Sequence, residues 1–247
     1  MDLTSGKAII ENFKKIDFDL IDSKRLILSG GEPLLHPDFF QFLEAAEGIR
    51  TVIASNGILI QENLEKLRRF RDQILIQLSL DGSEENHEFL RGSGTFDRLI
   101  NTLRILKKSD FSVAIKSTLH RKNIEDIPFL LEIASSFQFP ISFNYFIDSG
   151  FQREVEQISF DEYSELINRK KSFFQINSLY INGHCFAGIR HISVTPDLRY
   201  ISCPALKQPK YLGKYPDPLP FNRKLIFHSI FNQRSREKPD CLSSWYK

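Results

Sequence analysis

The sequence predicts an α/β protein, a partial, TIM-like (β/α) barrel followed by a small irregular, cysteine-containing C-terminal extension. Short apolar runs alternate with helical patterns, glycines and polar residues follow the runs, and the regular pattern ends well before the C-terminus. Runs that alternate with helices require a parallel sheet with the helices packed outside it. The right-handed crossovers of such a sheet curl it into a barrel or part of one.

An amphipathic helix opens the chain, with an apolar face made of Ile9, Ile10, Phe13 and Ile16. Five apolar runs then predict five strands. The runs are Arg25–Ser29, Thr51–Ser55, Ile74–Leu80, Ser112–Thr118 and Ile141–Phe146. Four helical patterns lie between them, with apolar faces that include Phe42, Leu67, Leu103 and Leu130. The predicted order is therefore a helix, four strand–helix units and a last strand.

Regular periodicity weakens after Phe146. A capping box, Ser159-Phe-Asp-Glu162, predicts one more helix, and Pro196-Asp197 predicts a turn. The hairpin strands expected around that turn are His191–Val194 and Arg199–Ser202. Residues 204–223 contain five prolines and predict an irregular loop. We therefore expect two domains, residues 1–178 and 179–247.

The composition is that of an ordinary soluble domain, with 41% hydrophobic and 26% charged residues. The chain has no apolar run near the ~18 residues that cross a bilayer and no signal-peptide pattern. We therefore expect a cytoplasmic protein without membrane contact. From Lys207 onward, nine Lys or Arg accompany three Asp or Glu. Such a basic stretch either docks an acidic partner or is a solvated surface, and nucleic acid is not the expected partner.

Four of the five runs end in or beside glycine or polar residues, at Gly30–Pro33, Ser55–Gly57, Ser79–Gly82 and Lys116–Thr118. In a parallel barrel the ligand site lies at the carboxyl ends of the strands, so these tips converge. The glycines let a ligand come close to the backbone, Glu32 offers a charge for an ammonium group, and Pro33 fixes the exit from the loop. The alternative is an ordinary strand-to-helix turn with a solvated Glu32.

These tips stand in motifs that resemble those of radical S-adenosylmethionine (AdoMet) enzymes. The motifs run in order along the chain: Leu-Ser-Gly-Gly-Glu-Pro-Leu-Leu-His-Pro-Asp (28–38), Ala-Ser-Asn-Gly (54–57), Gln-Leu-Ser-Leu-Asp-Gly (77–82) and Arg-Gly-Ser-Gly-Thr-Phe (91–96). Within that superfamily the chain is most similar to peptide- and protein-modifying members with a C-terminal SPASM extension. The resemblance implies a partial barrel, S-adenosylmethionine as cofactor and a peptide or protein substrate.

The resemblance also implies which residues hold the cofactor. The Gly-Gly-Glu-Pro loop would bind the amino group of the methionine part, and Ser79 and Asp81 would contact its carboxylate and the ribose. Asn56 matches a further strand tip of the family. The implied cofactor-binding residues are Gly30, Gly31, Glu32, Pro33, Asn56, Ser79 and Asp81.

All three cysteines lie in the last third of the chain, where structural disulfides are not expected in a cytoplasmic protein. The tail around Cys185 and Cys203 resembles the SPASM extension, which implies an auxiliary iron-sulfur cluster with Cys185, Cys203 and Cys241 as metal ligands. Leu198 stands where the family usually has Gly, and Ser244 stands where a further Cys is expected. The three thiols therefore hold one cluster, hold a zinc ion, or remain plain thiols.

No cysteine precedes Cys185, so the Cys-x3-Cys-x2-Cys motif of the family's catalytic 4Fe-4S cluster, with the strand before it, is not encoded in this sequence. Catalytic residues are unknown. One hypothesis is an incomplete chain of a radical AdoMet enzyme, and the alternative is a non-catalytic module that binds a peptide or protein partner. An open sheet edge is costly unless it is covered, which favours a fragment, a partner chain that covers the edge, or an edge rebuilt from residues 1–20. A third hypothesis, an unrelated phosphate-binding barrel enzyme, lacks paired catalytic carboxylates and a glycine-rich phosphate loop.

The histidines offer little general acid–base chemistry. We expect His36 and His87 to cap or pack, with His87 in a loop. His120 lies near the fourth strand tip, where it either contacts a carboxylate substrate or belongs to a solvated loop. The candidates for a fourth cluster ligand are His184 and His191.

Overall fold

The computed structural model describes residues 1–16, 24–146, 155–169, 180–181, 184–185, 192–201 and 211–219. The chain forms two compact units. One unit comprises Met1–Asp17, Ile147–Gln152 and Ile176–Lys247, and the other comprises Phe18–Phe146 and Arg153–Gln175. The second unit contains the predicted sheet and every predicted cofactor-binding residue.

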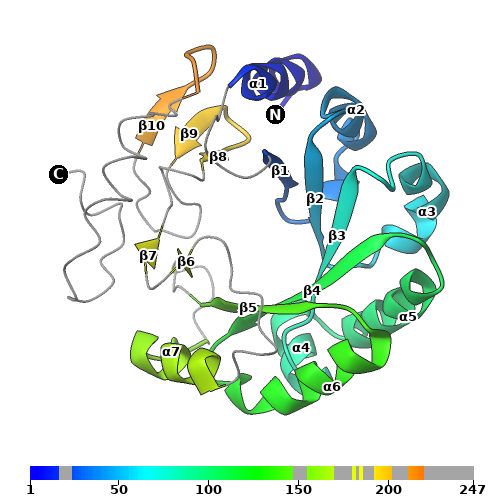
Figure 1. Ribbon diagram of the computed structural model, residues 1–247, viewed down its shortest axis with the longest axis vertical. Helices are drawn as coiled ribbons and strands as arrows, with labels where there is room; N and C mark the ends of the chain where they lie inside the picture. Colours follow the sequence, from blue (N-terminus) through cyan, green and yellow to red (C-terminus); the bar gives the residue numbers. More distant parts are fainter. Residues whose placement is uncertain are drawn as a thin grey trace. The chain divides into compact units, whose positions relative to one another are not determined.

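The five predicted strands are confirmed, and they form one parallel sheet in the order of the sequence. They are β1 (Arg25–Leu28), β2 (Arg50–Ser55), β3 (Ile74–Ser79), β4 (Ser112–Leu119) and β5 (Ile141–Tyr145). Figure 1 shows the sheet curled, with helices α2, α3, α5 and α6 on its outer side. The predicted partial barrel is therefore confirmed for this unit.

The α-helices of this unit follow the predicted order, with α4 as an additional one. The helices of the unit are the short 3-10 helices η1 (Pro33–Leu35) and η2 (Ile124–Asp126), and the α-helices α2 (Phe39–Ala45), α3 (Ile60–Arg68), α4 (Glu84–Arg91), α5 (Thr95–Lys107), α6 (Ile127–Phe137) and α7 (Phe160–Arg169). Helix α4 replaces the loop expected around His87, so that expectation was wrong. Helix α4 is eight residues long and its apolar residues are the adjacent Phe89 and Leu90, which is too short a pattern to show a helical repeat.

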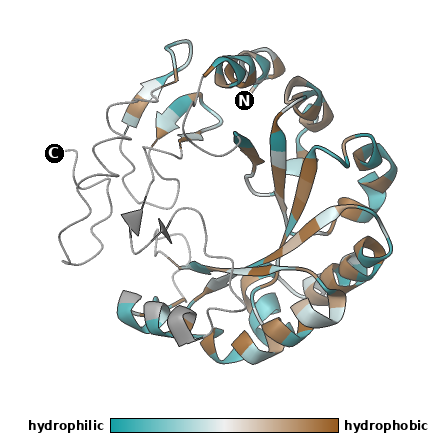
Figure 2. Ribbon diagram, in the orientation of Figure 1, coloured by the Kyte–Doolittle hydropathy of each residue, from teal (hydrophilic) through white to brown (hydrophobic). Residues whose placement is uncertain are grey.

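The core lies between the sheet and its helices. Along β4 the residues Val113, Ile115 and Leu119 are buried in the same cluster as Leu99 and Leu103 of helix α5. Successive strand residues point to opposite faces. The residues of β4 that alternate with the buried ones therefore face the inner side of the curled sheet. Figure 2 shows apolar colouring on β2 to β4 and mixed colouring on the surrounding helices, as expected for amphipathic helices.

The other unit contains the opening helix and short antiparallel strands. The elements are α1 (Leu3–Lys15), β6 (Tyr180–Ile181), β7 (His184–Cys185), β8 (Ser193–Val194), β9 (Arg199–Ile201) and β10 (Tyr211–Lys214). The predicted hairpin is confirmed as β8 and β9, and β10 pairs with β9 on its other side. The irregular loop expected over 204–223 was therefore wrong at β10, where a register shift before Gly213 obscures the alternation of a strand.

Two local predictions also have clear outcomes. The capping box at helix α7 is confirmed in its first half, since the Glu162 backbone N–H donates to the Ser159 hydroxyl over 3.1 Å. Within the described residues, no helix has the length and apolar character that a membrane span requires. The cytoplasmic location stays a prediction.

Candidate active site

The tip of β1 is tied to the tip of β2 through the carboxylate of Glu32. The Ser55 hydroxyl lies 3.0 Å from both carboxylate oxygens, and the Asn56 backbone N–H donates to Oε2 over 2.9 Å. The Leu34 backbone N–H adds a third donor over 3.2 Å. Charge-assisted bonds of this kind are about twice as strong as neutral ones, so Glu32 fixes the position of the glycine loop. Its predicted contact with an ammonium group stays a prediction.

The glycine loop itself is open to a ligand. A Cβ placed on Gly30 or Gly31 would meet no atom within 4 Å, and both residues are exposed. Packing within the protein therefore does not require glycine at either position. The free space beside this backbone fits a ligand that approaches it closely, which agrees with the predicted role. Pro33 is buried at the start of η1 and ends the loop.

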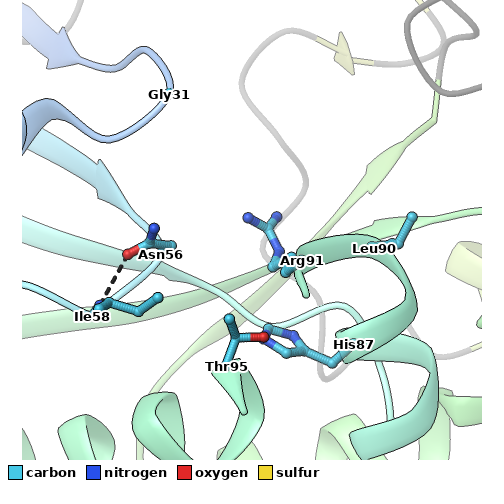
Figure 3. A pocket seen from close by; sticks show the side chains of 7 residues that line it. All are labelled: Gly31, Asn56, Ile58, His87, Leu90, Arg91 and Thr95. Carbon is cyan, nitrogen blue, oxygen red and sulfur yellow. Dashed lines mark hydrogen bonds between the residues drawn. The ribbon is translucent and has the colours of Figure 1, made fainter. Parts of the chain in front are cut away.

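Asn56 shapes the tip of β2. Its side-chain Oδ1 accepts a hydrogen bond from the Ile58 backbone N–H over 2.9 Å, a turn that asparagine forms readily. Between them, Gly57 has φ +85°, and a Cβ there would lie 2.7 Å from Leu99. Figure 3 shows the amide nitrogen of Asn56 on the side of the amide group away from Ile58.

The tip of β3 carries an ion pair between Asp81 and Arg91. Two guanidinium nitrogens of Arg91, Nε and Nη2, each lie 2.6 Å from Asp81 Oδ2. The other carboxylate oxygen accepts from the Thr118 backbone N–H over 2.9 Å, which joins β3 to β4. Asp81 is 2% exposed, whereas about a third of the Arg91 side chain is accessible. The Asp81 carboxylate is therefore buried, whereas part of the Arg91 guanidinium side chain is accessible to a ligand.

His87 supports this ion pair from helix α4. Its Nδ1 accepts from the Asp81 backbone N–H over 3.3 Å, so the proton of the neutral ring is on Nε2. Burial lowers the pKa of His87 from 6.5 to about 4, against an opposing effect of the Asp81 carboxylate. His87 is therefore an uncharged structural residue at neutral pH, and its expected packing role is confirmed.

Two residues of the connection after β4 hold the Asp81 loop in place. The Asn123 amide donates to the carbonyls of Asp81 and Thr118 over 2.9 and 3.0 Å, and Asn123 is fully buried. Asp126 accepts from Ser83, and a Cβ on Gly82 would lie 2.3 Å from its carboxylate. Only glycine leaves room for this contact. The φ of Gly82, +132°, is also one that residues with a side chain rarely adopt.

The other histidines have clear positions. His36 caps the loop after η1, because its Nδ1 accepts from the Asp38 backbone N–H over 3.1 Å. His120 is 1% exposed, so the solvated loop expected around it was wrong. Its backbone N–H donates to Asn123 Oδ1, and burial lowers its pKa. The backbone of His184 belongs to β7, and His191 lies outside the described residues.

One pocket joins the three tips. It has a volume of about 180 Å³ and is lined by Gly31, Asn56, Ile58, His87, Leu90, Arg91 and Thr95 (Figure 3). Whole-ligand pockets usually measure ~300–1,000 Å³, so this pocket fits one end of a nucleoside-sized ligand. Its polar lining combines the open glycine backbone, the Asn56 amide and the Arg91 guanidinium. These groups suit the amino acid end of AdoMet.

The predicted residues fall into three places around this pocket. Gly31 and Asn56 line it, while Glu32 and Asp81 lie behind it and hold its lining residues. Ser79 ends β3 on the inner face of the sheet. Arg91 was missed as a site residue although it begins the quoted motif at 91–96, because its helix was not predicted.

The structure leaves the predicted metal site untested. Cys185 belongs to β7, but its side chain is not described, and Cys203 and Cys241 lie outside the described residues. In the part of the chain that is described, no group of three His, Cys, Asp or Glu side chains is arranged to hold a metal ion. The iron-sulfur cluster therefore stays a prediction.

Comparison with known proteins gives relatives for most of the chain. An AdoMet-dependent haem synthase of Methanosarcina barkeri is 35% identical over 150 residues, which is 58% of this chain and 42% of the relative. The bacteriocin subtilosin biosynthesis protein AlbA of Bacillus subtilis is 26% identical over 260 residues, 92% of this chain and 53% of the relative. The chain thus spans about half the length of these curated relatives.

The fold is also found among solved structures. The crystal structure of Streptococcus suis SuiB bound to S-adenosylmethionine has a TM-score of 0.68 and 18% identity, covering 89% of this chain and 60% of SuiB. That likeness supports the partial barrel. The profile of the radical SAM superfamily matches residues 4–134, more than half of the chain. The resemblance inferred from the motifs at the strand tips is thereby confirmed, and the chain belongs to the radical SAM superfamily.

Proposed function

We propose that the chain binds S-adenosylmethionine, with the amino acid end of the cofactor in the pocket at the tips of β1, β2 and β3. One observation carries the proposal: Gly31, Asn56 and Arg91 come from three successive strand–helix connections and line a single pocket. In this superfamily bound AdoMet supplies radical chemistry. The residues of this chain would bind and orient it.

The charges around the pocket favour this orientation. The carboxylates of Glu32 and Asp81 already accept hydrogen bonds from the protein. The charged group of the pocket lining that is partly accessible to a ligand is the Arg91 guanidinium. A guanidinium binds a carboxylate more specifically than other side chains do. Arg91 would therefore hold the cofactor's carboxylate, and the exposed loop at Gly30 and Gly31 would lie along its amino group.

For the substrate we propose a peptide or protein. AlbA, named for bacteriocin biosynthesis, matches 92% of this chain, and SuiB bound to its precursor peptide SuiA covers 96% of it with a TM-score of 0.68. The three cysteines at positions 185, 203 and 241 are the proposed ligands of an auxiliary iron-sulfur cluster. A non-catalytic peptide-binding module would use the same barrel face, and product formation separates the two.

A second candidate substrate is a tetrapyrrole. The haem synthase of Methanosarcina barkeri is 35% identical to this chain, and an Fe-coproporphyrin III synthase of the same organism is 27% identical over 73% of it. Both candidate substrates carry carboxylates.

Calorimetric titration of AdoMet into the chain tests the cofactor proposal. We expect Arg91→Gln to weaken binding by roughly 10- to 150-fold, since a hydrogen bond to a charged group contributes about 1.5–3 kcal/mol. Asn56→Ala is a second variant that leaves the Asp81 ion pair intact. Arg104→Gln changes an exposed arginine of helix α5 and is the matched control. Absence of AdoMet binding at millimolar concentration, or equal binding by Arg91→Gln and Arg104→Gln, would overturn the proposal.

A further inference from the structure

The inner face of the described sheet carries a long cationic side chain near the carboxyl ends of its strands, Lys116 of β4, whereas Arg25 and Arg50 share this face at the amino ends of β1 and β2. The residues that alternate with Lys116 on the other face, Ile115 and Ser117, are fully buried toward the helices. Because strand side chains alternate, Lys116 points to the inner side of the curled sheet. Lys116 is paired with Ser79, the last residue of β3, so it lies near the carboxyl ends of the strands, where a barrel of this kind holds its ligands.

The four nearest neighbours of Lys116 on this face have short side chains. The strand register places Ser79 of β3 and Ser142 of β5 directly beside it. Ala114 and Thr118 precede and follow it on the same face of β4. Side chains in such positions lie about 4.5–7 Å apart. The Lys116 side chain is therefore longer than those of its four nearest neighbours, three of which carry hydroxyl groups.

No carboxylate neutralises Lys116 within the described residues. The described ion pairs join other residues, for example Arg121 with Glu162 and Arg91 with Asp81. Asp81, near the end of the neighbouring strand, already accepts from Arg91 and Thr118. Burial lowers the pKa of Lys116, and an ammonium group removed from water favours an anionic partner.

We propose that Lys116 anchors a carboxylate of the substrate on the inner face of the sheet, with the hydroxyls of Ser79 and Ser142 beside it. The inference deepens the proposed function, because it rests on a substrate that binds on this face. The carboxylate belongs to an acidic residue of a peptide or to a propionate of a tetrapyrrole, and the ammonium group recognises the same chemistry in both. Arg91, in the pocket at the strand tips, is left to the cofactor.

Competitive acetylation of lysines with peptide mass mapping tests this anchor directly. Two probes are used, coproporphyrin III and a short acetylated alanine peptide with one glutamate, each at millimolar concentration. We expect one probe to protect Lys116 from acetylation and to leave the exposed Lys108 unprotected. Protection by coproporphyrin III would show that the carboxylate belongs to a tetrapyrrole. Protection by the glutamate peptide, but not by the same peptide with glutamine in place of glutamate, would show that it belongs to a peptide.

The variants Lys116→Gln, Lys116→Arg and Lys108→Gln complete the test. Affinity for the protecting probe is expected to fall roughly 10-fold or more in Lys116→Gln, to be largely kept in Lys116→Arg, and to be unchanged in Lys108→Gln. AdoMet affinity is expected to stay the same in all three. Protection by neither probe would overturn the proposal, and so would loss of AdoMet affinity in Lys116→Gln, which would place Lys116 in the cofactor site. Probe binding without any AdoMet binding would refute the proposed cofactor and leave this inference standing.

Discussion

Acidification should destabilise the protein through His87, and the size of the effect follows from its environment. Burial lowers the pKa of His87 in the folded protein to about 4, while the unfolded chain keeps the ordinary value of 6.5. As pH falls below 6.5, the unfolded chain takes up the proton first, so the free energy of unfolding decreases until pH reaches about 4. Each pKa unit corresponds to 1.36 kcal/mol, and the loss is therefore about 3 kcal/mol over this range.

Urea unfolding followed by circular dichroism, repeated across this pH range, measures the loss. The variant His87→Asn keeps an acceptor near the Nδ1 position, which bonds the Asp81 backbone N–H, but it does not titrate. We expect this variant to be less stable than the native protein near neutral pH, because it leaves a cavity, and to show a shallower pH dependence. Since His120 titrates in both proteins, the difference between the two curves isolates His87. Parallel curves between pH 4 and 6.5 would refute the buried, neutral state of His87.

Two further substitutions test the supporting structure. Asn123→Ala removes the amide that joins the tips of β3 and β4 and should lower the free energy of unfolding by roughly 3 kcal/mol, because it leaves buried groups unpaired. Asn101→Ala on exposed helix surface is its control, and equal denaturant midpoints would contradict the role. Leu198→Gly should stabilise the β8–β9 hairpin by about 0.5–1 kcal/mol, because Leu198 has φ +68°. A lower melting temperature in Leu198→Gly would count against backbone strain at this turn.

The sequence predicted the sheet well because the sheet depends on strong, local signals. Each strand of β1 to β5 is an apolar run bounded by turn residues, and strict alternation between strands and helices requires parallel pairing. Helix α4 lacked such a signal, since its eight residues include only two apolar ones, Phe89 and Leu90, next to each other. The helix is instead stabilised by contacts distant in sequence, such as the hydrogen bond from Asn86 to Asp126 over 2.7 Å. Pattern reading cannot detect these contacts.

The sequence predicted at which edge of the sheet the candidate site lies, but not the contacts among its residues. Convergence of Glu32, Asn56 and Asp81 at one edge was expected from the parallel sheet. Glu32 bonds to Asn56, and Arg91, the partner of Asp81, lines the same pocket as Asn56, whereas the roles of these residues in cofactor binding stay predictions. The partners of the two carboxylates were not predictable. Glu32 meets the backbone N–H of Asn56 and Asp81 meets that of Thr118, partners 24 and 37 residues away. Such pairs depend on loop geometry that periodicity does not encode.

The anionic and cationic groups of the site differ in the partners that they have within the protein. Its carboxylates, Glu32 and Asp81, already accept hydrogen bonds from protein donors, whereas Arg91, which is paired with Asp81 but about a third accessible, and Lys116 are the cations that we propose bind ligands. A partly accessible guanidinium, and an ammonium group without a carboxylate partner among the described residues, attract ligand carboxylates. The two cations come from different elements, one from helix α4 at the strand tips and one from the inner face of β4. They are therefore suited to different ligands, and the cofactor and the substrate should each lose affinity through a different variant.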